Sequence, residues 1–132
     1  MIKDFLILNC IGVNDKIGLK FGNKFYIHDL DQKVNKNDQL VSSILNLVKK
    51  YKVNINNNFS ILVNNGPGSF STIRVALAVA KGIKIAKRIN LFDGVVVPGE
   101  IDVESETNMV DKDSCKKLFN SEIIIIINKI HT

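Results

Sequence analysis

The chain has 132 residues, of which 45% are hydrophobic and 23% are charged. That length supports one globular domain with an ordinary core and leaves too little chain for two. The longest apolar run, Ile123 to Ile127, is far shorter than the roughly 20 residues of a membrane-spanning helix. Because the N-terminus also lacks the pattern of a signal peptide, we expect a cytoplasmic protein without a membrane role.

The formal net charge of +5 raises the question of nucleic-acid binding. Only two of the 18 basic residues are Arg, however, the residue that suits bidentate contacts to phosphate and guanine. Residues 1–98 contain six acidic and 14 basic residues, whereas residues 99–132 contain seven and four. We therefore predict a domain over residues 1–98 and a separate acidic segment over residues 99–132.

The first part of the chain predicts a strand followed by a hairpin. Phe5–Cys10 is a nearly continuous apolar run, and the stretches Lys16–Phe21 and Lys24–His28 are split by Gly22-Asn23. After a polar loop, Asn37 and Asp38 are suited to cap a helix. Its apolar face is predicted from Leu40, Ile44, Leu47, Val48 and Tyr51.

The second part predicts a strand, a helix and another strand. Ser60–Val63 reads as a buried strand, the helix runs from about Ser69 to Arg88 and is closed by Asn90, and Leu91–Val97 follows. A helix between two strands implies a right-handed crossover and a parallel pair.

The acidic segment predicts one further strand. Glu100–Asp113 has little periodicity and predicts a loop, whereas Glu122–Ile130 has strong β propensity. An unpaired run of five Ile would promote aggregation, so we expect this strand to be paired or buried.

One loop is the first candidate for a binding site. Between the predicted strand and helix lie Gly66, Pro67, Gly68 and Ser69, and the first helical turns carry Phe70 and Arg74. Amide groups at such a loop can hold phosphate, but a tight turn and a helix cap need the same residues without any ligand. We favour the structural interpretation, because the loop matches neither a Walker motif nor a dinucleotide fingerprint.

The second predicted helix is the other candidate. Apolar residues cover nearly its whole circumference and leave a basic stripe of Arg74, Lys81, Lys84 and Arg88 for water. Ala78, Gly82 and Ala86 recur every four residues, which lets another helix approach closely. Either the rest of the chain covers this surface or a partner subunit does; we favour the partner.

Catalytic and metal-binding patterns are weak in this sequence. Its histidines, His28 and His131, do not form a helical pair, which argues against a zinc hydrolase. Cys10 and Cys115 lack an activating neighbour in sequence. The alternating acids Glu100, Asp102, Glu104 and Glu106 are more typical of a solvated loop than of a metal site.

The segment Gly66–Arg74, followed by an Ala-rich helix with Lys81-Gly82, resembles the GPGSFTGLR…AKGLA signature of the TsaB (YeaZ) family. The resemblance covers about residues 1–98. It implies an α/β fold, a single ribonuclease H-like lobe of the actin-like ATPase superfamily, with a mixed sheet and two main helices. It also implies no catalytic residues, no metal and no cofactor in this chain.

In that family the resemblance implies a non-catalytic scaffold for threonylcarbamoyl transfer to tRNA adenosine. Its partners would be a TsaD-like catalytic subunit and, indirectly, a TsaE-like ATPase, with tRNA contacted indirectly and a homodimer when the chain is alone. The partner surface is expected on both helices, at Leu40, Ile44, Ile73, Leu77, Ala78, Lys81, Gly82 and Ile85.

The sequence departs from the family in three places. Asn9-Cys10 replaces the usual Asp-Thr of the first strand, Thr72 replaces a signature glycine, and nothing after Pro98 resembles the family's second lobe. Two alternative functions therefore stay open: a nucleotide or phosphate-binding protein that uses Gly66–Ser69, and a tRNA-binding module that uses Lys81, Lys84 and Arg88.

Overall fold

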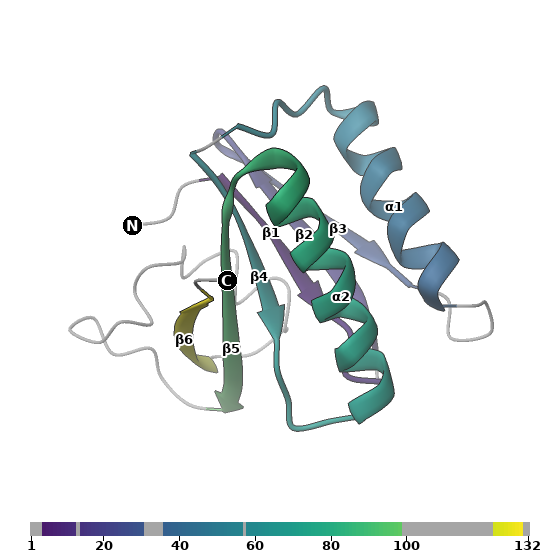
Figure 1. Ribbon diagram of the computed structural model, residues 1–132, viewed down its shortest axis with the longest axis vertical. Coiled ribbons are helices and arrows are strands. Elements are labelled where there is room, and N and C mark those ends of the chain that lie inside the picture. The colour runs from purple at the N-terminus through teal and green to yellow at the C-terminus, as the bar shows by residue number, and fades with distance from the viewer. Residues whose placement is uncertain (1–3, 13, 31–35, 57, 99–122, 131–132) are drawn as a thin grey trace.

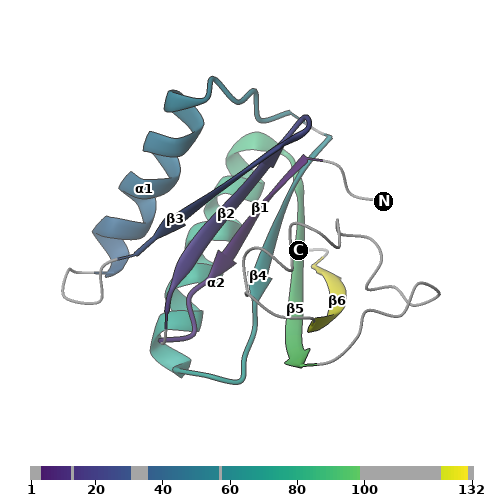
Figure 2. The same cartoon turned by 180° about the vertical axis from the view of Figure 1, so that it is seen from behind.

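A computed structural model describes residues 4–12, 14–30, 36–56, 58–98 and 123–130, with side chains for residues 4–12, 14–30, 39–56 and 58–94. Its elements are β1 (Asp4–Asn9), β2 (Lys16–Phe21), β3 (Lys24–Asp29), α1 (Lys36–Lys50), β4 (Phe59–Asn64), α2 (Phe70–Lys87), β5 (Asn90–Pro98) and β6 (Ile123–Ile130). The six strands form one sheet in the order β3-β2-β1-β4-β5-β6. Both helices lie side by side on one face of this sheet (Figures 1 and 2).

The sheet is mixed. β1, β2 and β3 pair antiparallel as a meander, while β1 pairs parallel with β4 and β4 pairs parallel with β5. Helix α1 returns the chain from the hairpin to β4, and α2 returns it from β4 to β5. The predicted parallel pair around the second helix is thus confirmed.

The core explains the nearly continuous apolar run of β1. Leu6 and Leu8 belong to the cluster that the helices cover, whereas Phe5 and Ile7 point to the opposite face, and all four are buried. A strand buried on both faces carries apolar residues at successive positions instead of alternate ones.

Helix α1 turns one apolar stripe into the core and leaves a second one outside. Leu40, Ile44 and Leu47 are buried, while Val41 and Leu45 remain 43% and 62% exposed. The helix begins at Lys36, so Asn37 and Asp38 lie in its first turn and the prediction that they cap it is wrong. The polar run before Leu40 carries no residue that stops a helix, and the boundary moves accordingly.

Helix α2 ends at an unexpected residue. Arg88 is its C-cap, with a left-handed φ of 54° and its amide bonded to the Lys84 carbonyl, whereas the predicted closing residue, Asn90, begins β5. The prediction that only a basic stripe reaches water is also wrong, because Ala78, Ile85 and Ala86 are exposed as well. The sheet and α1 cover only part of the helix circumference.

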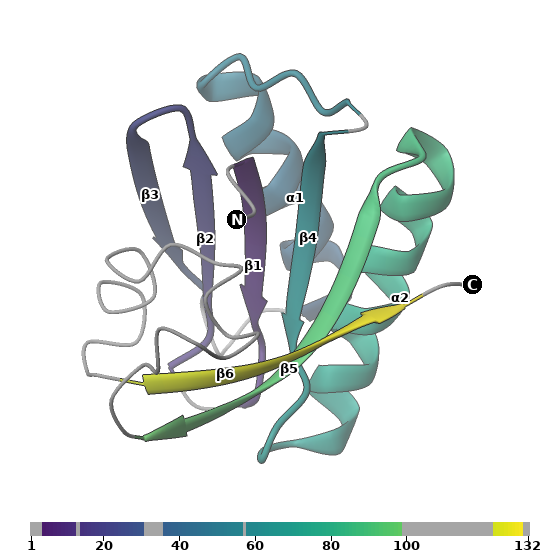
Figure 3. The same cartoon turned by 90° about the vertical axis from the view of Figure 1, so that its left-hand side faces the viewer.

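The final strand joins the same sheet. β6 pairs antiparallel with β5, from Leu91↔Ile130 to Pro98↔Ile123, and Figure 3 shows it beyond β5 at the sheet edge. The prediction of a paired strand is confirmed, while the predicted loop Glu100–Asp113 lies outside the described residues. Among the described helices, neither is long and apolar enough to span a bilayer.

Candidate functional site

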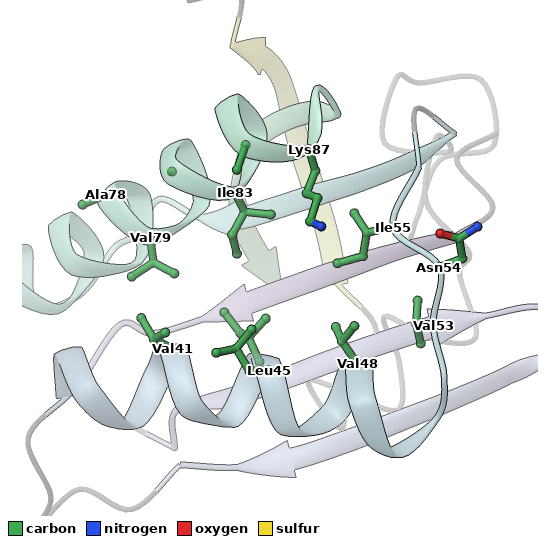
Figure 4. A pocket seen from close by; sticks show the side chains of 13 residues that line it. Val41, Leu45, Val48, Val53, Asn54, Ile55, Ala78, Val79, Ile83 and Lys87 are labelled. Atoms are coloured by element: carbon green, nitrogen blue, oxygen red, sulfur yellow. The ribbon is translucent and has the colours of Figure 1, made fainter.

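A groove of about 570 Å³ separates α1 from α2. Figure 4 shows Val41 and Leu45 of α1 pointing toward Val79 and Ile83 of α2, with the segment Val53–Ile55 at one end. Apart from Asn54 and Lys87, its lining is apolar or glycine. The residues are Val41, Ile44, Leu45, Val48, Val53, Asn54, Ile55, Ala78, Val79, Gly82, Ile83, Ala86 and Lys87.

The wall formed by α2 is low, because small residues lie at every fourth position. Ala78, Gly82 and Ala86 are all exposed and all line the groove. A Cβ atom added to Gly82 would meet no atom within 4 Å. The opposite wall carries Leu45, which is 62% exposed. An apolar side chain from outside could therefore enter between the helices.

The structure separates the predicted interface residues into two groups. Leu40, Ile44 and Ile73 are 2%, 2% and 6% exposed and belong to the interior, so they support the helices and offer little or no surface of their own. Leu77 is half-buried. The other four predicted residues are exposed: Ala78, Lys81, Gly82 and Ile85.

Two residues of the groove were missed from the sequence. Val41 and Leu45, with Val48, follow the spacing i, i+4, i+7 on α1 and form a second apolar stripe beside the core stripe. That second stripe was the signal that could have identified them.

The Gly66–Ser69 loop packs tightly against the turn after β1. The Ser69 amide donates to the Ile11 carbonyl at 2.6 Å, and a Cβ on Gly68 would lie 2.6 Å from that same oxygen. On the other side, a Cβ on Gly12 would lie 2.8 Å from Ser69 Cβ. The glycines are therefore explained by the close approach of two turns.

The amides of this loop are largely bonded within the protein. Pro67 has no N–H, the Gly66 amide donates to Asn64 Oδ1 at 3.1 Å, and the Ser69 amide is bonded to Ile11. Ser69 occupies the N-cap position but its side chain makes no capping bond. Two of the three N–H groups that a phosphate would use are thus occupied.

The remaining signature residues pair with each other. The Arg74 guanidinium lies 5.4 Å from the centroid of the Phe70 ring, and Phe70 is 74% exposed. This contact places an aromatic ring and a cation on the surface at the start of α2.

Two further polar contacts hold the loop where the sequence departs from the family. Asn9 and Asn64, both buried, are joined by a bond from Asn64 Nδ2 to Asn9 Oδ1 at 2.7 Å. The Thr72 hydroxyl donates to the Cys10 carbonyl at 2.8 Å and also lies 3.1 Å from the Ser69 carbonyl. Both departures therefore contribute bonds between β1, β4 and α2.

Other chemistry finds little support in the described part of the chain. No group of three His, Cys, Asp or Glu side chains there could hold a metal ion. Cys10 is buried and His28 is exposed on β3. The remaining candidates lie outside the described residues: Cys115, His131, Glu100, Asp102, Glu104 and Glu106.

Comparison with known proteins gives one clear sequence relative. Over 85 residues the chain is 34% identical to the tRNA threonylcarbamoyladenosine biosynthesis protein TsaB of Buchnera aphidicola subsp. Baizongia pistaciae (strain Bp), a match that covers 64% of this chain and 38% of the relative. No family model matches the chain.

Two solved structures share the fold. YeaZ from Pseudomonas aeruginosa has a TM-score of 0.64 at 16% identity and aligns with 79% of this chain and 56% of its own. A second Pseudomonas aeruginosa protein, described as similar to peptidase YEAZ, has a TM-score of 0.63 at 14% identity, with coverages of 98% and 61%.

The chain thus spans less than two thirds of each protein that it matches. The predicted fold class, a ribonuclease H-like mixed sheet with two main helices, is confirmed by the shared fold. The sequence match to TsaB and the fold shared with YeaZ together make this chain a relative of the TsaB/YeaZ family.

Proposed function

We propose that the chain is a non-catalytic scaffold subunit in the formation of threonylcarbamoyladenosine in tRNA. Its α1–α2 groove would bind a TsaD-like catalytic subunit, and a TsaE-like ATPase would act through that subunit. The relative's name supports the process. The groove supports the mode of action, because it is the apolar surface that the described part of the chain leaves open.

The exposed apolar side chains of the groove carry this proposal. Leu45 and Val41 stand on one wall, and the exposed small residues of α2 leave room opposite them. Burial of a side chain such as Leu contributes about 1.5–3 kcal/mol, and a few such anchors account for most of the affinity at many interfaces. A partner that covers the groove gains that energy.

Scaffold function agrees better with the loop geometry than phosphate binding does. The loop fills the space beside Ile11 and bonds two of its three amides internally. A nucleotide would have to displace these contacts. A tRNA-binding role for Lys81, Lys84 and Arg88 is the second candidate, since no acidic side chain lies on α2.

Light scattering on mixtures with the TsaD-like subunit of the same organism tests the proposal. We expect a 1:1 complex with the wild-type chain and its loss with Leu45→Asp, since a carboxylate would enter the apolar groove. Asn46→Asp is the matched control, because Asn46 is exposed on the same helix but does not line the groove. An equally stable complex with Leu45→Asp, or no complex at all, would refute the proposed binding mode.

A further inference from the structure

The described side chains around the groove carry charge of one sign. Helix α2 contains no acidic residue, and α1 contains none among residues 39–50. The acidic side chains that the structure describes belong to the sheet and its turns: Asp4, Asp15, Asp29 and Asp93. Basic residues on or next to the two helices are Lys49, Lys50, Lys52, Arg74, Lys81, Lys84, Lys87 and Arg88.

The acidic side chains make their contacts away from the groove. Asp29 pairs with Lys16 at 3.3 Å on the hairpin, Asp4 accepts a bond from the Gly22 amide, and Asp93 accepts one from Asn65. Among the described residues, none of them can neutralise the helix surface.

The arrangement of the helices concentrates this charge at one end. Figure 1 shows α1 and α2 running in the same direction, so Lys49 and Lys50 lie at the same end of the groove as Lys87, which lines it. The opposite end holds Arg74 and the positive ends of the two helix dipoles.

A two-fold pair of identical copies would bring positive charge against positive charge. If the helices of the two copies were parallel, their lysine-rich ends would meet. If they were antiparallel, each lysine-rich end would meet Arg74 and the helix N-termini of the other copy. Both arrangements are repulsive, and charges this close are incompletely screened, because the Debye length is about 10 Å at 0.1 M salt.

We infer that the basic rim of the groove selects against a second copy of this chain and for a protein whose apolar ridge is bordered by Asp or Glu. This inference rests on the proposed function and replaces the expectation of a homodimer. The apolar lining favours a protein over RNA, since the groove can be filled only by apolar groups. Charges at a rim mainly set specificity, association rate and salt dependence.

A charge-reversed copy of the same chain serves as the probe. Lys81→Glu/Lys87→Glu keeps the groove and places carboxylates at its rim. Mixed with the wild type at about 50 mM salt, we expect it to form a heterodimer at least about tenfold more tightly than the wild type pairs with itself. That preference should shrink at about 500 mM salt.

The matched control is Lys20→Glu/Lys24→Glu, which changes the net charge equally on the β2–β3 hairpin. This control should not pair with the wild type. If the reversed variant fails to fold in circular dichroism, the neutral variant Lys81→Gln/Lys87→Gln replaces it, and we expect it to associate with itself more strongly than the wild type.

Three results would overturn the inference. A wild-type dimer that is equally tight at both salt concentrations, or equal pairing by the hairpin control, would show that the rim does not select. Salt-sensitive binding of tRNA that Leu45→Asp leaves unchanged would assign the basic residues to RNA. The proposed function is judged separately, because its test is the loss of the TsaD-like complex in Leu45→Asp.

Discussion

The Gly66–Ser69 loop and the α1–α2 groove differ in how completely the chain satisfies them. At the loop, backbone groups from two turns bond to each other, and no space remains for a Cβ atom on Gly68. At the groove, a Cβ atom on Gly82 would touch nothing, and apolar side chains face water. The signature segment that identifies the family is therefore explained by packing, whereas the surface beside it requires another molecule.

This difference separates what a residue does for folding from what it does for binding. Substitutions in the first region should lower stability, and substitutions in the second should leave stability unchanged and alter association. Four pairs of variants test that separation, each with a core or loop residue set against an exposed neighbour.

The largest difference is expected between two leucines of α1. Leu40 is 2% exposed and Leu45 is 62% exposed. Leu40→Ala should lower the free energy of unfolding by about 2–5 kcal/mol because it leaves a cavity, and Leu45→Ala by about 0.5 kcal/mol or less. Urea denaturation measures both, and equal losses would show that the groove wall is part of the core.

Two glycines provide the second pair. Gly68→Ala should destabilise by about 1–3 kcal/mol, because the new methyl group overlaps the Ile11 backbone. Gly82→Ala should stabilise the helix by up to about 1 kcal/mol, since alanine favours the helix and the site is open. Thermal unfolding distinguishes the signs, and a neutral Gly68→Ala would contradict the close packing of the two turns.

Neighbouring asparagines provide the third pair. Asn64→Ala should cost about 1–2 kcal/mol, because it leaves the buried Asn9 oxygen and the Gly66 amide without their partner. Asn65→Ala removes an exposed bond to Asp93 and should cost about 0.5 kcal/mol or less. A double-mutant cycle with Asn9→Ala should show coupling between Asn9 and Asn64, and its absence would exclude the bridge.

The smallest effect is expected at the residue that replaces a signature glycine. Thr72→Val keeps the shape but removes the hydroxyl that bonds to the Cys10 carbonyl, which should cost about 1 kcal/mol. Ser71→Ala, on the exposed side of the same turn, should have little effect. If chemical denaturation finds Thr72→Val as stable as the wild type, the hydroxyl does not hold β1 to α2.

The sequence predicted most of the fold, because its elements have clear periodicity and clear ends. β2 has the predicted bounds, and the remaining strands and the second helix differ by one or two residues. The errors lie at helix ends: α1 starts before its supposed caps, and α2 closes on Arg88 in a left-handed conformation. Tertiary packing decides such ends, and single-residue preferences cannot.

The candidate site was predicted only in outline. The small residues of α2 were identified from their spacing and do line the groove. Leu40 and Ile44 were assigned to the surface because a sequence does not show which of two apolar stripes on α1 faces the sheet. The contacts of Asn9 and Thr72 depend on neighbours 55 and 62 residues away in the chain, which no local pattern reveals.

The most direct test is to measure threonylcarbamoyladenosine formation in tRNA by the TsaD-like and TsaE-like proteins of the same organism. We predict that the product forms when the wild-type chain or Asn46→Asp is added, and that it is strongly reduced without the chain or with Leu45→Asp. Full activity in the absence of the chain, or equal activity with Leu45→Asp, would contradict a scaffold that acts through the α1–α2 groove.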